Sequence, residues 1–153
     1  MEISELIETD VVIPNLKVNS KKHALQEISS TLAKKAGLDE RSVVDTILFR
    51  EKLGTTGVGQ GVAIPHGKFE NLDKIYGLFA RIITPIDFDS VDDLPVDLIF
   101  LLLVPEHSGA EHLKMLAKIS RLFRNRGLCE KLRGSDNADA LFALLSQSNN
   151  NAS

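Results

Sequence analysis

A run of seven consecutive apolar residues, Leu98–Val104, constrains the fold more than any other part of the chain. The run does not alternate between apolar and polar residues, which is typical of a strand buried on both faces in the middle of a sheet. At seven residues it is far too short to cross a bilayer as a helix, which takes about 20 residues. We therefore expect a central strand over 96–104, ended by Pro105.

Apolar residues at helical spacing predict helices on either side of this strand. Ser20 is placed to cap the first helix and Gly37 to end it, and a second helix is expected from Asp39 to about Arg50. Further helices are predicted from 109, near 128–132, and from 136 to 145. Strands are predicted at 11–13 before Pro14, at 62–66, and at 76–83 before Pro85. This mixed order of elements favours a single α/β sandwich with helices on both faces of the sheet.

The length of 153 residues suits one domain, which we place at 1–146. The last residues, 147–153, are polar and rich in Asn and Ser, so we expect a disordered C-terminal tail.

Composition excludes several classes of function. The net charge of -3 and the small share of aromatic residues give no case for binding nucleic acid. The single cysteine, Cys129, allows no disulfide framework and favours a reducing compartment. The N-terminus is acidic and has no long apolar run, unlike a signal peptide. We expect a cytoplasmic protein that needs no cofactor and does not insert into a membrane.

The segment with the most chemical content ends in Pro65-His66-Gly67. Pro65 fixes its own φ and Gly67 permits unusual backbone angles, so His66 is expected at the end of a strand with its ring exposed. The glycines upstream, Gly57, Gly59 and Gly61, recur at every second residue, which fits neither a P-loop nor a dinucleotide fingerprint. An imidazole held in this way suits a nucleophile, a proton shuttle or a metal ligand, although an ordinary loop histidine is the alternative.

Three further groups suggest what this imidazole does. His112 is predicted in the first turn of the helix that follows the central strand, where backbone amides favour an anion. Arg50 ends the second helix, and its guanidinium can donate paired hydrogen bonds to phosphate oxygens. Thr55 and Thr56 add hydroxyl donors in the loop that follows. Together with His66 these groups describe an acceptor for a phosphoryl group.

Less specific interpretations remain open for these residues. Arg50 is also suited to pair with the helix dipole, and His112 to be a partly buried residue at a helix start. A metal site built from His66, His107 and His112 is disfavoured, because the last two are five residues apart and no H-E-x-x-H pattern occurs.

The stretch Arg50–Lys68, followed later by Glu111-His112-Leu113, resembles the enzyme IIA components of the bacterial phosphotransferase system, mannitol/fructose class. The resemblance extends from about Leu6 to Leu145 and is strongest to the stand-alone nitrogen-regulatory type. It implies a mixed sheet of about five strands flanked by helices. It also implies a phosphohistidine at His66, usually on Nε2, with His112 and Arg50 lining the site.

The same resemblance implies the partners. The donor would be a phosphocarrier protein of the HPr type, and the targets would be regulatory proteins. Thr55, Thr56 and Gly67 are expected to contact phosphate, and Val58, Val62 and Phe69 to form an apolar rim for docking. Two alternatives stay open: a fructose- or mannitol-specific IIA component that passes phosphate to a IIB domain, and a binding regulator that acts without phosphorylation.

Overall fold

The computed structural model describes residues 2–151 and, of residues 148–151, only the helical backbone. Its helices are α1 (Ile3–Leu6), a 3-10 helix (Thr9–Val11), α2 (Lys21–Ala36), α3 (Glu40–Leu53), α4 (Ala110–Phe123), α5 (Arg126–Arg133) and α6 (Ala138–Asn151). Its strands are β1 (Val12–Leu16), β2 (Gly57–Gly59), β3 (Val62–Ala63), β4 (His66–Phe69), β5 (Tyr76–Ile86) and β6 (Val96–Pro105).

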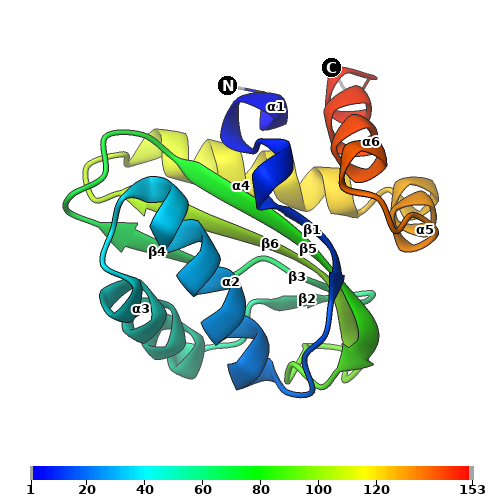
Figure 1. The fold of residues 1–153 in the computed structure, drawn as a ribbon, viewed down its shortest axis with the longest axis horizontal. Helices are drawn as coiled ribbons and strands as arrows, with labels where there is room; N and C mark the ends of the chain where they lie inside the picture. The colour runs from blue at the N-terminus through cyan, green and yellow to red at the C-terminus, as the bar shows by residue number, and fades with distance from the viewer. Residues whose placement is uncertain (1, 152–153) are drawn as a thin grey trace.

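The described strands form one mixed, six-stranded sheet, and helices cover both of its faces. The main order is β1-β5-β6-β3-β2, and β4 pairs with β6 beyond the end of β3. Strands β3 and β4 run parallel to β6, whereas β5 runs antiparallel to it. Helices α2 and α3 lie in front of the sheet and α4 lies behind it (Figure 1). The predicted α/β sandwich is thus confirmed, with one strand more than expected.

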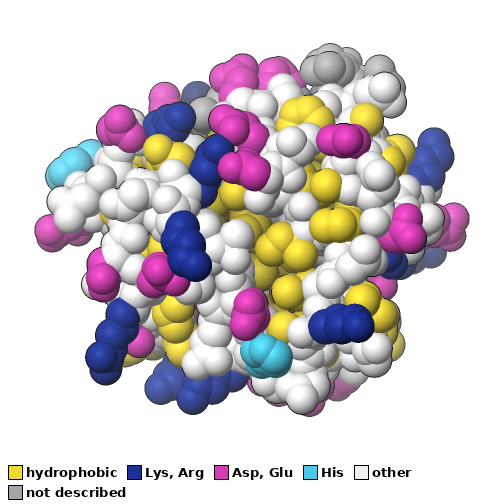
Figure 2. Space-filling view, viewed as in Figure 1, with side chains coloured by type: hydrophobic (Ala, Val, Ile, Leu, Met, Phe, Trp, Pro, Cys, Tyr) yellow, Lys and Arg dark blue, Asp and Glu magenta, His cyan; other side chains and the backbone are white. Residues whose placement is uncertain are grey.

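Strand β6 is the centre of the hydrophobic core, as its apolar run predicts. Every residue of Leu98–Val104 is fully buried, because β6 has neighbours on both edges and helices over both faces. On the surface, hydrophobic atoms gather between α2 and α6, over β1, with charged side chains around them (Figure 2).

Helix boundaries follow the predicted caps at the start of the chain. The Ser20 side chain accepts a hydrogen bond from the backbone N–H of His23, and Asp39 does the same for Ser42. Gly37 ends α2 in the left-handed conformation, with φ 72°.

Several element boundaries differ from the sequence prediction. Pro14 lies inside β1, which is tolerated because β1 is an edge strand and needs no donor on its outer side. Strand β5 likewise continues past exposed Pro85, where its register against β6 is irregular. Helix α3 runs on to Leu53 instead of ending at Arg50.

The predicted tail is partly wrong. Helix α6 continues to Asn151, so residues 147–151, which the polar composition led us to expect as disordered, are helical. The remaining residues of the predicted tail, 152 and 153, lie outside the described part of the chain.

Candidate active site

His66 is the first residue of β4, and its ring is half-buried, rather than ending a strand and being exposed as predicted. Strands β3 and β4 lie along the same edge of β6 and are separated by Ile64 and Pro65. Pro65 has no N–H to give to a ladder, but its carbonyl accepts a hydrogen bond from the Leu102 backbone. This short break in the ladder leaves the backbone carbonyl of Ile64 free to bind the His66 side chain.

The hydrogen bond between His66 and Ile64 defines the state of the ring. Nδ1 of His66 lies 3.0 Å from the backbone oxygen of Ile64. A carbonyl oxygen can only accept, so Nδ1 of the neutral ring carries the hydrogen, and Nε2 keeps its lone pair. The atom that can act as a nucleophile is therefore Nε2.

His112 lies beside this nucleophile. It occupies the first turn of α4, as predicted, and is 6% exposed. The centroids of the two imidazole rings are 5.5 Å apart, and the ring planes are inclined by 59°. Within the described residues, the buried Nε2 of His112 has no hydrogen-bond partner. A buried polar atom of this kind is suited to bind an oxygen of a group carried by His66.

Arg50 has the helix-end role that the sequence left open, and its charge also reaches His66. It lies in the last turn of α3, and its Nη1 donates a hydrogen bond to the backbone oxygen of Gly54 at 2.9 Å. Its positive charge also acts on His66, where it is one of the causes of a lowered pKa.

Both histidines have lowered pKa values, which keeps them neutral at pH 7. Burial is the main cause for His66, and the charge of Arg50 adds to it, while the Ile64 hydrogen bond and Glu51 act in the opposite direction. Burial is also the main cause of the lowered pKa of His112, followed by the charges of His66 and Lys68. A neutral His66 at physiological pH is what nucleophilic attack by Nε2 requires.

These causes predict a selective effect of two charge-removing substitutions. Arg50→Gln is expected to raise the pKa of His66 and leave the pKa of His112 unchanged. Lys68→Gln is expected to raise the pKa of His112 and leave the pKa of His66 unchanged. Titration of the two rings by NMR measures both values in one sample. Equal shifts of both rings in either variant would contradict the assignment.

The same lowered pKa values set the sign of the effect of pH on stability. Above pH 6.5 both rings are neutral in the folded and unfolded chain alike. As the pH falls below 6.5, the unfolded chain takes up protons first, so the folded state loses stability until the folded pKa values are reached. The stabilising contribution is therefore present above pH 6.5 and lost in acid.

The structure does not support the expected phosphate contacts of Thr55 and Thr56. The hydroxyl of Thr55 donates to the backbone oxygen of Phe88 at 2.9 Å, and the buried hydroxyl of Thr56 donates to Glu51 at 2.7 Å. Both hydroxyl hydrogens are thus used inside the protein.

The glycines of this region serve close packing within the chain rather than the approach of a ligand. A Cβ on Gly67 would lie 3.1 Å from Cδ1 of Ile47 in α3, and Gly67 does not use the positive φ that a glycine permits. A Cβ on Gly57 would collide with the side chain of Ser90. Gly59 and Gly61 do have positive φ values, because they lie at the tight turn of a β2–β3 hairpin.

The predicted docking rim is partly wrong. Val58 is exposed, Phe69 is half-buried, and Val62 is only 1% exposed because it pairs with Leu98 of the central strand. Two other exposed apolar residues, which the sequence did not single out, are close in the chain to site residues. Leu113 follows His112 in α4, and Leu53 lies three residues beyond Arg50 in α3. We call this pair the apolar rim. Apolar residues on the solvent side of the predicted helices were the signal that could have found it.

Two further findings concern classes of function considered above. Among residues 2–151, no group of three or more His, Cys, Asp or Glu side chains is placed to hold a metal ion. No helix in the same range is long and apolar enough to cross a membrane.

Comparison with known proteins shows the family and supports the fold. Residues 5–148 match the family described as the phosphoenolpyruvate-dependent sugar phosphotransferase system, EIIA 2. A "Nitrogen regulatory protein" of Bradyrhizobium diazoefficiens is 55% identical over 145 residues, which cover 95% of each chain. The crystal structure of the nitrogen regulatory protein IIA-Ntr from Neisseria meningitidis superposes with a TM-score of 0.89 at 38% identity, and covers 94% of this chain and 98% of its own.

A sugar-specific relative also matches over a shorter stretch. The fructose-specific EIIA component of Haloferax volcanii is 38% identical over 109 residues, which cover 71% of each chain.

The matched family is one of phosphoryl carriers, and an α/β sandwich that holds a half-buried histidine beside a second histidine fits this class. The chain belongs to the EIIA type 2 family of the phosphoenolpyruvate-dependent sugar phosphotransferase system.

Proposed function

We propose that this protein accepts a phosphoryl group on Nε2 of His66 from an HPr-type phosphocarrier, and that its phosphorylation state regulates partner proteins in the cytoplasm. The observation that carries the proposal is the hydrogen bond from Nδ1 of His66 to the Ile64 carbonyl, which leaves Nε2 as the nucleophile. The neighbouring His112, with its unpartnered Nε2, supports the same chemistry.

The proposed step is a simple displacement. The lone pair on Nε2 of His66 forms a bond to phosphorus as the bond between phosphorus and the donor's histidine nitrogen breaks, and that electron pair returns to the donor. The hydrogen on Nδ1 stays in its bond with Ile64. We expect the positive charge of Arg50 to offset the charge on the phosphoryl oxygens, and neutral His112 to donate a hydrogen bond to one of them.

Regulation is favoured over sugar transport by the high identity to a nitrogen regulatory protein. The chain is 55% identical to a nitrogen regulatory protein over 95% of both chains, whereas its identity to the fructose-specific component of Haloferax volcanii is 38%. The physical basis of regulation would be the charge of the phosphoryl group, about -2, on an exposed surface.

The fate of the phosphate separates the two alternatives. The protein is charged from labelled phosphoenolpyruvate with enzyme I and an HPr-type carrier, then chased with membranes and a panel of sugars that includes mannitol and fructose. We expect the label to stay on the protein or return to the carrier, whichever sugar is present. Rapid loss of label that depends on one sugar would identify a transport component instead.

A docking prediction follows from the apolar rim. Because a phosphocarrier must bring its own histidine in line with His66, Leu53 and Leu113 are expected to contact it. Leu113→Asp should raise the donor concentration needed for half-maximal transfer by about tenfold, as loss of one well-placed apolar contact does at many interfaces. The matched control is Val91→Asp, which changes an equally exposed residue in the β5–β6 loop. Equal effects of both substitutions would contradict this rim.

A further inference from the structure

Glu51 is a buried carboxylate in an unfavourable place. It lies in the last turn of α3, where the helix dipole disfavours a negative charge, and its side chain is 4% exposed. Burial of an ionised carboxylate is costly unless it is paired and hydrogen-bonded. The structure shows no hydrogen bond from Glu51 to either imidazole of the site. A buried carboxylate at this position must therefore have another role.

Both carboxylate oxygens of Glu51 are bound to the turn that follows α3. Oε1 accepts a hydrogen bond from the backbone N–H of Thr56, and Oε2 accepts one from its hydroxyl, each at 2.7 Å. The ammonium of Lys21, at the start of α2, lies 3.0 Å from Oε1. The carboxylate therefore joins the start of α2 to the turn at 54–56.

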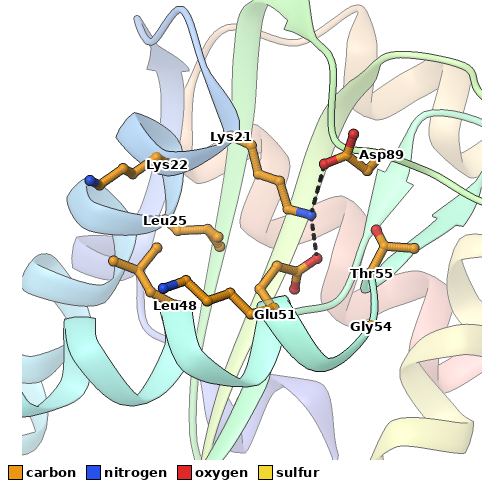
Figure 3. Close-up of a pocket in the computed structure, with 9 residues that line it drawn as sticks. Lys21, Lys22, Leu25, Leu48, Glu51, Gly54, Thr55 and Asp89 are labelled. Carbon is orange, nitrogen blue, oxygen red and sulfur yellow. Dashed lines mark ion pairs between the residues drawn. The ribbon is translucent and has the colours of Figure 1, made fainter.

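Figure 3 shows Lys21 and Glu51 among the residues that line a cleft between α2 and α3. The volume of this cleft is about 520 Å³. The Lys21 ammonium lies between Glu51 and Asp89, with Asp89 at 3.6 Å, and 4.8 Å above the centre of the Phe88 ring. Lys21 is thus fixed by three groups. Lys22 lines the same cleft but points away from the ion pairs.

From Thr56 a continuous hydrogen-bonded path leads to His66. The backbone oxygen of Thr56 accepts from the N–H of Ile64 at 3.0 Å, and the backbone oxygen of Ile64 binds Nδ1 of His66, also at 3.0 Å. Since Pro65 has no N–H, the backbone N–H of Ile64 is the last one available before His66 itself. This bond to Thr56 holds the backbone of Ile64, and with it we expect the Ile64 carbonyl to be held toward His66.

The turn that Glu51 holds also positions the arginine of the site. The backbone oxygen of Gly54 accepts from Nη1 of Arg50, and the N–H of Gly54 donates to the backbone oxygen of Glu51 at 3.3 Å. Movement of this turn would therefore displace both the Ile64 carbonyl and the partner of Arg50.

We propose that Glu51 and Lys21 are positioning residues, which hold the Thr56–Ile64 path and thereby keep the hydrogen of His66 on Nδ1 and the lone pair on Nε2. They do not contact the phosphoryl group. The inference rests on the proposed function only for its kinetic consequence, because the state of the His66 ring exists before any phosphate is bound.

The test measures the His66 ring by ¹⁵N NMR in the full chain without phosphate, then the rate of phosphoryl transfer. In the unaltered protein the ¹⁵N shifts should show the Nδ1–H tautomer. Glu51→Gln should cause a several-fold rise in the Nε2–H form and lower the maximal transfer rate about tenfold, with the half-saturating donor concentration unchanged, because small misplacements of a reacting group are costly in rate. Lys21→Met should act in the same direction.

Three further variants separate the positioning role from a general defect in folding. Lys22→Met, at the exposed neighbour in the cleft, should change neither readout. The double variant of Glu51→Gln and Lys21→Met should be no worse than the worse single variant, because both changes break one network. If Glu51→Gln does not fold, Thr56→Val removes one donor to Glu51 and serves instead.

An unchanged tautomer in folded Glu51→Gln and Lys21→Met would overturn the inference, and so would slower transfer without a change of tautomer. If the tautomer shifts in the variants but the unaltered protein accepts no phosphate, the positioning role is upheld and the proposed function is refuted.

Discussion

The His66→Ala variant is expected to take no phosphate at all from an HPr-type donor. Nε2 of His66 supplies the electron pair for the new bond to phosphorus, and alanine has no atom that can do so. The measurement is transfer of labelled phosphate from phosphoenolpyruvate through enzyme I and the carrier. Because the ring is only half-buried, circular dichroism and thermal unfolding should show a folded protein.

The matched control for this prediction is His107→Ala. His107 is exposed in the turn before α4 and should be replaceable without any loss of labelling. Undiminished labelling of His66→Ala, or loss of labelling in His107→Ala, would contradict the assignment of the nucleophile.

The second large effect concerns His112. His112→Ala is expected to slow transfer to His66 by about 100-fold, as removal of one group that stabilises transition-state charge does in other enzymes. The reason is the unpartnered, buried Nε2 of His112 beside the His66 ring. Phosphate should still be found on His66. Single-turnover transfer under rapid mixing, with donor in excess, gives the rate.

A conservative substitution tests whether hydrogen bonding is the reason. His112→Gln can place an amide nitrogen near the position of Nε2 and should recover part of the lost rate. If glutamine is as slow as alanine, then donation to the phosphoryl group is not the role of His112. Phosphate bound covalently to His112 would mean that the two histidines have exchanged roles.

Local signals in the sequence were enough for most of the fold. The unbroken apolar run at Leu98–Val104 correctly predicted the buried centre of the sheet, and Ser20 and Gly37 correctly marked the two ends of α2. These features depend on neighbours within a few residues. The errors at β1, β5 and α6 arose where composition or a proline was taken to end an element that tertiary packing sustains.

The candidate site was predictable only in part. His66, His112 and Arg50 could be chosen from their positions at strand and helix ends, and the structure brings them together. Their surroundings could not be chosen in this way, because the contacts join distant parts of the chain. Lys21 and Glu51 are 30 residues apart in sequence, and the need for Gly67 comes from Ile47 in another element. Spacing along the sequence does not reveal such contacts.

The position of the phosphate on the charged protein tests the central claim most directly. The measurement is a ¹⁵N–³¹P correlation spectrum of the chain after transfer from an HPr-type donor. We predict one phosphate per chain, bound to Nε2 of His66, with Nδ1 still carrying the hydrogen that it donates to Ile64. Phosphate on Nδ1 of His66, on His112, or on no histidine would contradict the account.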